Sequence, residues 1–214
     1  MEKTVQLLWK VCGMKYIENI LAVAELKPDL MGFIFAPESA RYVGEDFVLP
    51  KLPEDIHKVG VFVNEDAAYM LEKASQYALS FLQLHGEEDP AVCEALHHKD
   101  FRVLKAFALD SSFDFSHLTA YEPYVNYFLF DTKGAARGGN GQPFDWNLLK
   151  QYRLAKPFWI SGGIDLENIA GLMNFIHENQ LPCTGIDVNS KFETSPGFKD
   201  PALLAQLKQI IQKT

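Results

Sequence analysis

The chain has 214 residues, of which 48% are hydrophobic and 22% charged, a composition typical of a soluble globular protein with a substantial core. Its formal net charge is -8 and it contains no long run of Lys or Arg, which argues against a nucleic-acid-binding surface. The three cysteines form no CxxC pair, so they indicate neither a disulfide framework nor a zinc site.

The sequence contains no sign of a membrane segment. No apolar run reaches the length of a membrane-spanning helix, and Met1–Gln6 lacks the long apolar stretch of a signal peptide. With its few cysteines, the chain is expected to be cytoplasmic. Because no low-complexity linker divides it, we expect one domain over residues 1–214.

Short apolar segments alternate along the chain with segments of helical periodicity. Short, continuously apolar runs rich in β-formers are typical of strands that are buried on both faces. Eight strands are predicted, at residues 9–12, 30–35, 58–63, 81–85, 102–107, 127–131, 158–161 and 185–188.

Helix signals fall between these strands. Apolar residues recur at helical spacing from Ile17 to Ala24, and Glu65-Asp66 then begins a second helix. Asp89-Pro90 is an N-cap followed by Pro at the first helical position. Residues 111–124 have a weak helical pattern, so we expect mostly loop there.

The second half of the chain continues the alternation. A glycine-rich loop, Gly134–Gly141, follows the sixth strand. Three aspartates are predicted to cap the later helices, and the last of them is again followed by Pro: Asp145, Asp165 and Asp200.

Eight strands that alternate with seven or eight helices predict a single (β/α)8 barrel, with the helix after the fifth strand weak or absent. A doubly wound open sheet is the alternative. Eight units within ~210 residues suit the compact end of the barrel range better.

In such a barrel the chemistry lies at the carboxyl ends of the strands. Cys12 ends the first predicted strand and Asp131 ends the sixth, so both are candidate reactive groups. A free cysteine is otherwise a small buried hydrophobic residue. Arg41, in the loop after the second strand, has a planar fork that suits a carboxylate, although a solvated surface arginine is the alternative.

Phosphate groups in these barrels are commonly held near the seventh and eighth strands by backbone N–H groups. Ser161-Gly162-Gly163 and Asp187–Ser190 lie at these two strand ends, and a plain Gly-Gly turn is the alternative. His85 follows Gln83 by two positions, so the two side chains share one strand face. A buried histidine held by its neighbours is the simpler interpretation of His85, and no HxH or HExxH spacing indicates a metal.

Several motifs occur in a fixed order across nearly the whole chain. They are Lys10–Gly13, Gly32–Phe35 with Ser39–Val43, Val59–Asn64, Leu82–Gly86, Asp131–Gly134 with Gly138–Gly141, Phe144–Trp146, Ser161–Gly163, and Asp187–Ser190 through Ser195–Gly197. Together they resemble phosphoribosylanthranilate isomerase. The chain departs from the usual family pattern at Ala40, Asn189 and Lys191, and the last two affect the phosphate loop.

The resemblance implies an enzyme of tryptophan biosynthesis that needs no cofactor. The family converts N-(5-phosphoribosyl)anthranilate, a phosphorylated aminosugar, to 1-(2-carboxyphenylamino)-1-deoxyribulose 5-phosphate by an Amadori rearrangement. By resemblance, Cys12 is the general base, Asp131 is the general acid and Arg41 holds the anthranilate carboxylate. The remaining residues expected to bind substrate are His85, Gly162, Gly163, Asp187, Asn189 and Ser190.

The chemistry of this rearrangement explains why the active site needs one acid and one base. An acid must protonate the ring oxygen of the aminofuranose, and a base must then take the C2′ proton of the Schiff base. We therefore expect Asp131 to hold a proton at neutral pH and Cys12 to lose one. Lys10, two positions before Cys12 on the same strand face, is expected to help only modestly.

Two other functions are possible from sequence alone. Another phosphosugar barrel, such as an indole-glycerol-phosphate synthase or a sugar-phosphate epimerase, would need catalytic lysines or a metal cluster at the strand ends. A catalytically silent barrel that only binds a phosphorylated ligand would not need both Cys12 and Asp131.

Overall fold

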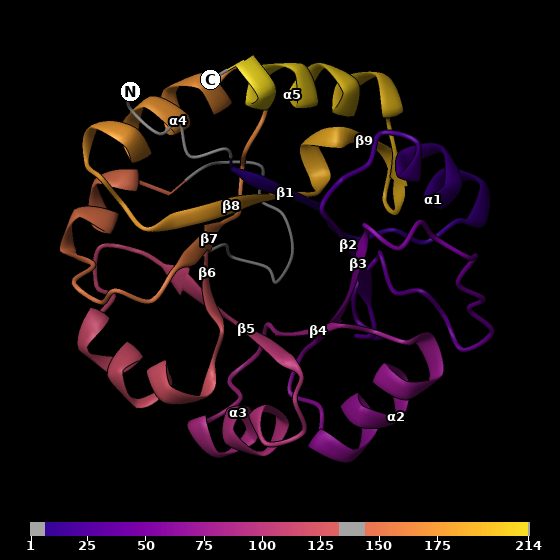
Figure 1. The fold of residues 1–214 in the computed structure, drawn as a ribbon, viewed down its shortest axis with the longest axis horizontal. Coiled ribbons are helices and arrows are strands. Elements are labelled where there is room, and N and C mark those ends of the chain that lie inside the picture. Colours follow the sequence, from indigo (N-terminus) through magenta and orange to yellow (C-terminus); the bar gives the residue numbers. More distant parts are fainter. Residues whose placement is uncertain (1–6, 133–143, 214) are drawn as a thin grey trace.

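The computed structural model describes residues 7–132 and 144–213, and its strands form a closed parallel barrel (Figure 1). Each strand pairs with the next along the chain, and the last pairs with the first. The (β/α)8 prediction is confirmed. The strands are β1 (Leu8–Val11), β2 (Leu30–Ile34), β3 (His57–Phe62), β4 (Phe81–Leu84), β5 (Arg102–Leu109), β6 (Tyr127–Thr132), β7 (Phe158–Ile160) and β8 (Cys183–Val188).

Helices surround the barrel as an outer ring (Figure 1). The α-helices are α1 (Ile17–Ala24), α2 (Ala67–Tyr77), α3 (Pro90–His97), α4 (Ile169–Glu178) and α5 (Pro201–Lys213). Short 3₁₀ helices at Phe115–Ala120, Glu122–Tyr124 and Trp146–Gln151 follow β5 and β6. The Asp89 carboxylate accepts the N–H of Val92 at 3.1 Å, so the N-cap predicted there is confirmed. The Asp66 carboxylate accepts the N–H of Tyr69 at 2.8 Å and caps the helix predicted to begin at Glu65-Asp66.

The connection between β2 and β3 has no α-helix, contrary to strict alternation. Pro37, Pro50 and Pro53 interrupt it, and proline is incompatible with a helix interior. Phe47 covers this side of the barrel instead, with its ring 5.5 Å from that of Tyr77. The Tyr77 hydroxyl donates to the Phe47 carbonyl at 3.1 Å, which fixes the loop against α2.

Two further elements differ from the prediction. The helix predicted to begin at Asp165 starts only at Ile169, because the Asp165 carboxylate accepts the N–H groups of Glu167 and Asn168 and forms a separate turn. An unpredicted antiparallel hairpin, β9 (Glu193–Ser195) and β10 (Phe198–Lys199), follows β8. The predicted glycine-rich loop Gly134–Gly141 lies outside the described residues.

Alternating strand residues divide the core into two layers. One set fills the barrel interior: Leu30, Ile34, Val59, Val61, Phe81, Leu104, Ala106, Leu129 and Trp159. The other set packs against the outer helices. Lys10, Gln83 and Asp187 are buried polar exceptions, and burial obliges them to find partners inside the barrel. In the part of the chain that is described, no helix has the length and apolar character needed to cross a membrane.

A buried ion pair links β5 to the loop after β4. Lys105 on β5 and Glu88, in the loop after β4, lie 2.9 Å apart with each side chain only 2% exposed. The Lys105 ammonium also donates to the Gly86 carbonyl at 2.7 Å, and the Glu88 carboxylate accepts the N–H of Asn64 at 2.8 Å. The pair therefore joins the loops that follow β3 and β4 to β5.

We expect Glu88→Gln to lower the free energy of unfolding by about 3 kcal/mol, because it leaves the Lys105 ammonium buried without its counter-charge. Urea denaturation checks this value. Glu72→Gln on the exposed surface of α2 is the control and should change stability by no more than about 0.5 kcal/mol. A loss below about 1 kcal/mol for Glu88→Gln would contradict the importance of the pair.

Candidate active site

A cavity opens at the carboxyl ends of the strands. Its empty space, counted to its open mouth, is about 900 Å³. The predicted site residues on its wall are Cys12, His85, Asp131, Gly162, Gly163, Asp187, Asn189 and Ser190. The structure therefore brings together every predicted site residue except Arg41, as the barrel topology requires.

Cys12 lies directly after β1, where its backbone N–H donates to the Val188 carbonyl at 2.9 Å and continues the pairing with β8. The thiol is 95% buried and projects over Gly32 of β2. A Cβ atom at position 32 would lie 2.8 Å from Cys12 Sγ and 3.1 Å from Lys10 Cε. The absent side chain at Gly32 thus leaves room for both groups, which are neighbours inside the barrel.

Lys10 is fully buried inside the barrel, beside Asp187 of the cavity wall. Lys10 and Asp187 occupy paired positions of β1 and β8, and their Nζ and Oδ2 atoms are 2.6 Å apart. The ammonium also reaches across the barrel to Gln83 Oε1 on β4, at 2.7 Å. The second carboxylate oxygen of Asp187 is buried and has no hydrogen-bond partner among the described residues.

The Lys10 contact determines the tautomer of His85. An ammonium only donates, so the Gln83 oxygen must face Lys10 and the Gln83 amide nitrogen must face His85. That nitrogen donates to His85 Nδ1 at 2.8 Å, which places the proton of neutral His85 on Nε2. Nε2 lies 3.2 Å from Asp131 Oδ2 and donates to it. A chain of polar contacts therefore runs from Asp187 on β8 to Asp131 on β6.

Asp131 is ionised in the free protein. Burial raises the pKa of this carboxyl group, but the hydrogen bonds that it accepts from His85 and from the N–H of Thr132 lower it by more, so the net shift is downward. The Thr132 N–H lies 2.8 Å from Asp131 Oδ1. The expectation that Asp131 holds a proton is thus wrong for the free protein, because His85 stabilises the carboxylate.

Cys12 is protonated in the free protein, also against expectation. Burial raises the pKa of the thiol above its ordinary value of 9.0. The charge of Lys10 opposes this shift and that of Asp187 adds to it. Lys10 nevertheless acts on the thiol more strongly than expected from its spacing along β1, because its charge and its hydrogen-bonding capacity both lower the pKa of Cys12.

The Gly162-Gly163 turn after β7 is sterically required. Both residues have positive φ angles, of 84° and 66°. A Cβ at position 162 would lie 2.4 Å from Thr132 Oγ1 and 2.5 Å from Asp131 Oδ1. The turn therefore allows the backbone to pass directly beside Asp131, and the side-chain amide of Asn168 supports it through a hydrogen bond to the Gly163 carbonyl at 2.7 Å.

Arg41 is the one predicted site residue that is not on the cavity wall. Its side chain lies at the rim, where its Cδ would be 2.7 Å from a Cβ at Gly13. The guanidinium contacts the Glu193 carboxylate of β9. Sequence reasoning missed Glu193 and Lys199, although Glu193 lies within the span of the last motif and Lys199 lies two residues after it.

A family model of N-(5'-phosphoribosyl)anthranilate (PRA) isomerase matches residues 9–210. The N-(5'-phosphoribosyl)anthranilate isomerase of Phocaeicola vulgatus is 44% identical over 208 residues, which cover 95% of this chain and 98% of that protein. The chain belongs to the phosphoribosylanthranilate isomerase family.

Solved structures of phosphoribosylanthranilate isomerases have the same fold. The enzyme of Thermotoga maritima superposes with a TM-score of 0.79 at 29% identity, covering 97% of this chain and 100% of that one. A second solved isomerase, in complex with reduced 1-(o-carboxyphenylamino)-1-deoxyribulose 5-phosphate, has a TM-score of 0.76 at 28% identity with the same coverage of both chains.

We expect the thiol of Cys12 to titrate with a midpoint above 9.0 in the free isomerase, because burial outweighs the attraction of Lys10. Ultraviolet absorbance of the thiolate against pH, with Cys12→Ser subtracted, measures this midpoint. Burial raises the pKa of Cys93 and of Cys183 to about 12, so neither interferes. Lys10→Met should move the midpoint higher, and a midpoint below 9.0 in the parent protein would contradict this account.

Proposed function

We propose that this chain catalyses the Amadori rearrangement of N-(5-phosphoribosyl)anthranilate to 1-(2-carboxyphenylamino)-1-deoxyribulose 5-phosphate in tryptophan biosynthesis. The observation that carries the proposal is that Cys12 and Asp131 line one cavity from β1 and β6, in a member of this family. A base and an acid on separate strands can act on different atoms of one substrate.

Asp131 is the proposed general acid. Its carboxyl group donates a proton to the ring oxygen while the bond between C1′ and that oxygen breaks, and the aniline nitrogen shares its electron pair to form the Schiff base. His85 orients the carboxyl group through Nε2. We therefore assign His85 a positioning role toward Asp131, in addition to its predicted contact with substrate.

Cys12 is the proposed general base. Its thiolate takes the C2′ proton of the Schiff base, and the resulting enolamine tautomerises to the ketone product. The adjacent Lys10 ammonium stabilises the thiolate, and Asp187 together with Gln83 holds that ammonium in place. Both catalytic groups thus depend on the same buried lysine.

The reaction needs the opposite distribution of protons from that in the free protein. The reactive form carries its proton on Asp131 and has an ionised Cys12. The two forms hold the same number of protons, so their ratio does not depend on pH, and together they predominate between the two pKa values. We propose that bound substrate favours the reactive form, because it displaces water from Asp131 and so raises the pKa of the carboxyl group.

The substrate phosphate is assigned to the loops after β7 and β8. Gly162, Gly163, Asn189 and Ser190 line the cavity, and phosphate groups favour the fixed backbone N–H donors that such loops supply. Lys191 also lines this region and adds a positive charge where the family usually has glycine.

We expect the product, or an analogue that carries its phosphate, to stabilise the protein by ~2.7 kcal/mol when present at ~100 times its dissociation constant. Thermal melting with and without ligand checks this. Gly163→Asp should abolish the stabilisation, because it adds a negative charge and a side chain at a residue with positive φ. If ligand leaves the melting temperature of the parent unchanged, the proposed phosphate site is wrong.

Loss of fluorescence from phosphoribosylanthranilate made in situ tests the activity directly. A silent ligand-binding barrel would give no turnover, and an enzyme for a different phosphosugar would turn over only its own substrate. Within the described residues no three metal-ligating side chains cluster, so this part of the chain offers no metal centre to a metal-dependent epimerase.

We expect Cys12→Ser and Asp131→Asn each to lower turnover by about 10²–10⁴-fold while affinity for the product changes little. Serine is a far weaker base than a thiolate, and an amide has no acidic proton to give to the ring oxygen. Steady-state kinetics and calorimetric product binding separate the two effects. Cys183→Ser, at a buried cysteine away from the cavity wall, controls for loss of a buried thiol. Near-parental turnover of Cys12→Ser would remove Cys12 from the mechanism.

We further propose that the enzyme acts as one barrel domain over residues 1–214 in the cytoplasm, on a phosphorylated small molecule. Three free thiols, Cys12, Cys93 and Cys183, suit a reducing compartment.

A further inference from the structure

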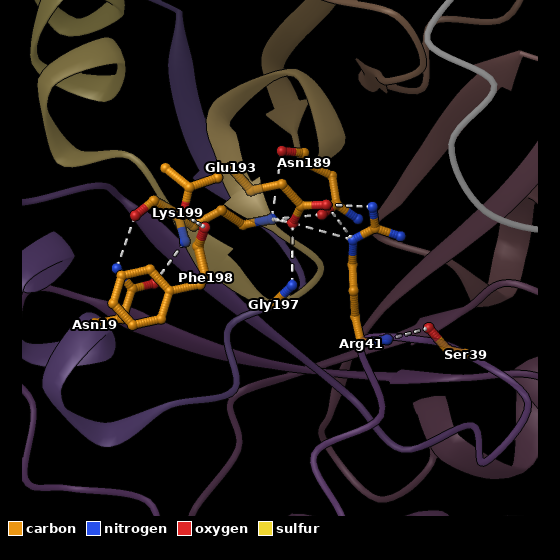
Figure 2. A network of polar contacts seen from close by, with 9 residues as sticks. Asn19, Ser39, Arg41, Asn189, Glu193, Gly197, Phe198 and Lys199 are labelled. Atoms are coloured by element: carbon orange, nitrogen blue, oxygen red, sulfur yellow. Dashed lines mark hydrogen bonds and ion pairs between the residues drawn. The ribbon is translucent and has the colours of Figure 1, made fainter.

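The guanidinium of Arg41 is anchored by one edge only. Its Nε lies 2.9 Å from Oε1 and 3.1 Å from Oε2 of Glu193, and its Nη2 also donates to Oε1 (Figure 2). Within residues 7–132 and 144–213, Nη1 makes no hydrogen bond or ion pair. Glu193 therefore holds the side edge of the planar fork and leaves its outer edge for a second carboxylate.

A buried lysine compensates for the charge of Glu193. The ammonium of Lys199 is fully buried and lies 2.7 Å from Glu193 Oε2, on the side of the carboxylate away from Arg41 (Figure 2). It also lies 2.6 Å from Oδ1 of Asn189, which lines the cavity. Two cations thus share one anion, and the cluster keeps a net positive charge that can attract a further anion.

The hairpin after β8 sets this geometry. Glu193 and Lys199 occupy paired positions of β9 and β10, so the backbone pairing places the carboxylate and the ammonium together. The N–H of Gly197, at the hairpin turn, donates to Glu193 Oε2 at 3.2 Å. The stem of Arg41 packs over Gly13, opposite the Asn189 side chain. The anchor is therefore built into the fold and lies beside the cavity.

We infer that Glu193 and Lys199 are positioning residues that make the site selective for a substrate with a ring carboxylate. Glu193 orients Arg41 so that its outer edge meets the anthranilate carboxylate, and Lys199 prevents Glu193 from neutralising Arg41. This inference rests on the proposed function, in which Arg41 holds that carboxylate. It assigns the selectivity to the hairpin as well as to the arginine.

The test compares two ligands that differ only in the carboxylate. One is reduced 1-(o-carboxyphenylamino)-1-deoxyribulose 5-phosphate and the other is its phenylamino counterpart without the carboxylate. We define the selectivity ratio as the dissociation constant of the ligand without the carboxylate divided by that of the carboxylated ligand, both measured by calorimetry. General losses of stability or of phosphate binding affect both constants and cancel in this ratio. Arg41→Lys measures how much of this selectivity depends on the planar fork.

We expect Glu193→Gln to reduce the selectivity ratio on the order of tenfold, through weaker binding of the carboxylated ligand alone. Glu193→Asp keeps the negative charge but moves it by one methylene, so it should reduce the ratio by a smaller factor. Because it keeps a charged partner for Arg41 and Lys199, it should also fold if Glu193→Gln does not. Either change should raise KM for phosphoribosylanthranilate with little effect on kcat. In an Arg41→Lys background, Glu193→Asp should have no further effect on the ratio.

Glu88→Gln is the matched control, because it breaks another buried lysine–glutamate pair away from the cavity wall. It should destabilise the protein and leave the selectivity ratio unchanged. If Arg41→Lys removes the selectivity but the Glu193 variants keep it or bind the carboxylated ligand more tightly, the inference is overturned and the proposed function stands. If Arg41→Lys itself keeps the selectivity, the carboxylate contact of the proposed function is wrong and the inference falls with it.

Discussion

The site depends on one buried charge, the ammonium of Lys10 inside the barrel. An unpaired ammonium there would cost several kcal/mol, so the surrounding strands must supply partners. Asp187 supplies the counter-charge and Gln83 a hydrogen-bond acceptor. Because an ammonium only donates, the orientation of Gln83 and then the tautomer of His85 follow from it. One lysine therefore determines donor and acceptor roles as far away as Asp131.

This arrangement joins the proposed base and acid through a common network. Cys12 lies beside Lys10 at one end, and Asp131 accepts a hydrogen bond from His85 Nε2 at the other. In the free protein the network favours a protonated thiol and an ionised carboxylate. Such polar chains are strongly coupled in a low-dielectric interior, so a change at either end alters the other. The resting protein is thus stable in a protonation state that substrate must change.

At the rim of the cavity, as in the barrel interior, a buried charge needs partners of opposite charge, but the arrangement of these partners differs. Glu193 would be costly to bury alone, and Arg41 and Lys199 compensate it from two sides. Burial raises the pKa of the Glu193 carboxyl group, but these two cations lower it by more, so the carboxylate stays charged. Inside the barrel an anion compensates one essential cation, whereas at the rim two cations surround one anion. The difference leaves the rim positive, where the proposed substrate carries its carboxylate.

The sequence alone determined the barrel and eight of the residues on the cavity wall. Buried strands, the cap at Asp89 and the ordered motifs are local features, so spacing and residue type are enough to recognise them. The partnerships are not local: Lys10 and Gln83 are 73 positions apart, and Arg41 and Glu193 are 152 apart. Only closure of the barrel and formation of the hairpin bring these side chains together. The pKa directions also came from the tertiary structure, because burial and the neighbouring charges set them and neither exists in an extended chain.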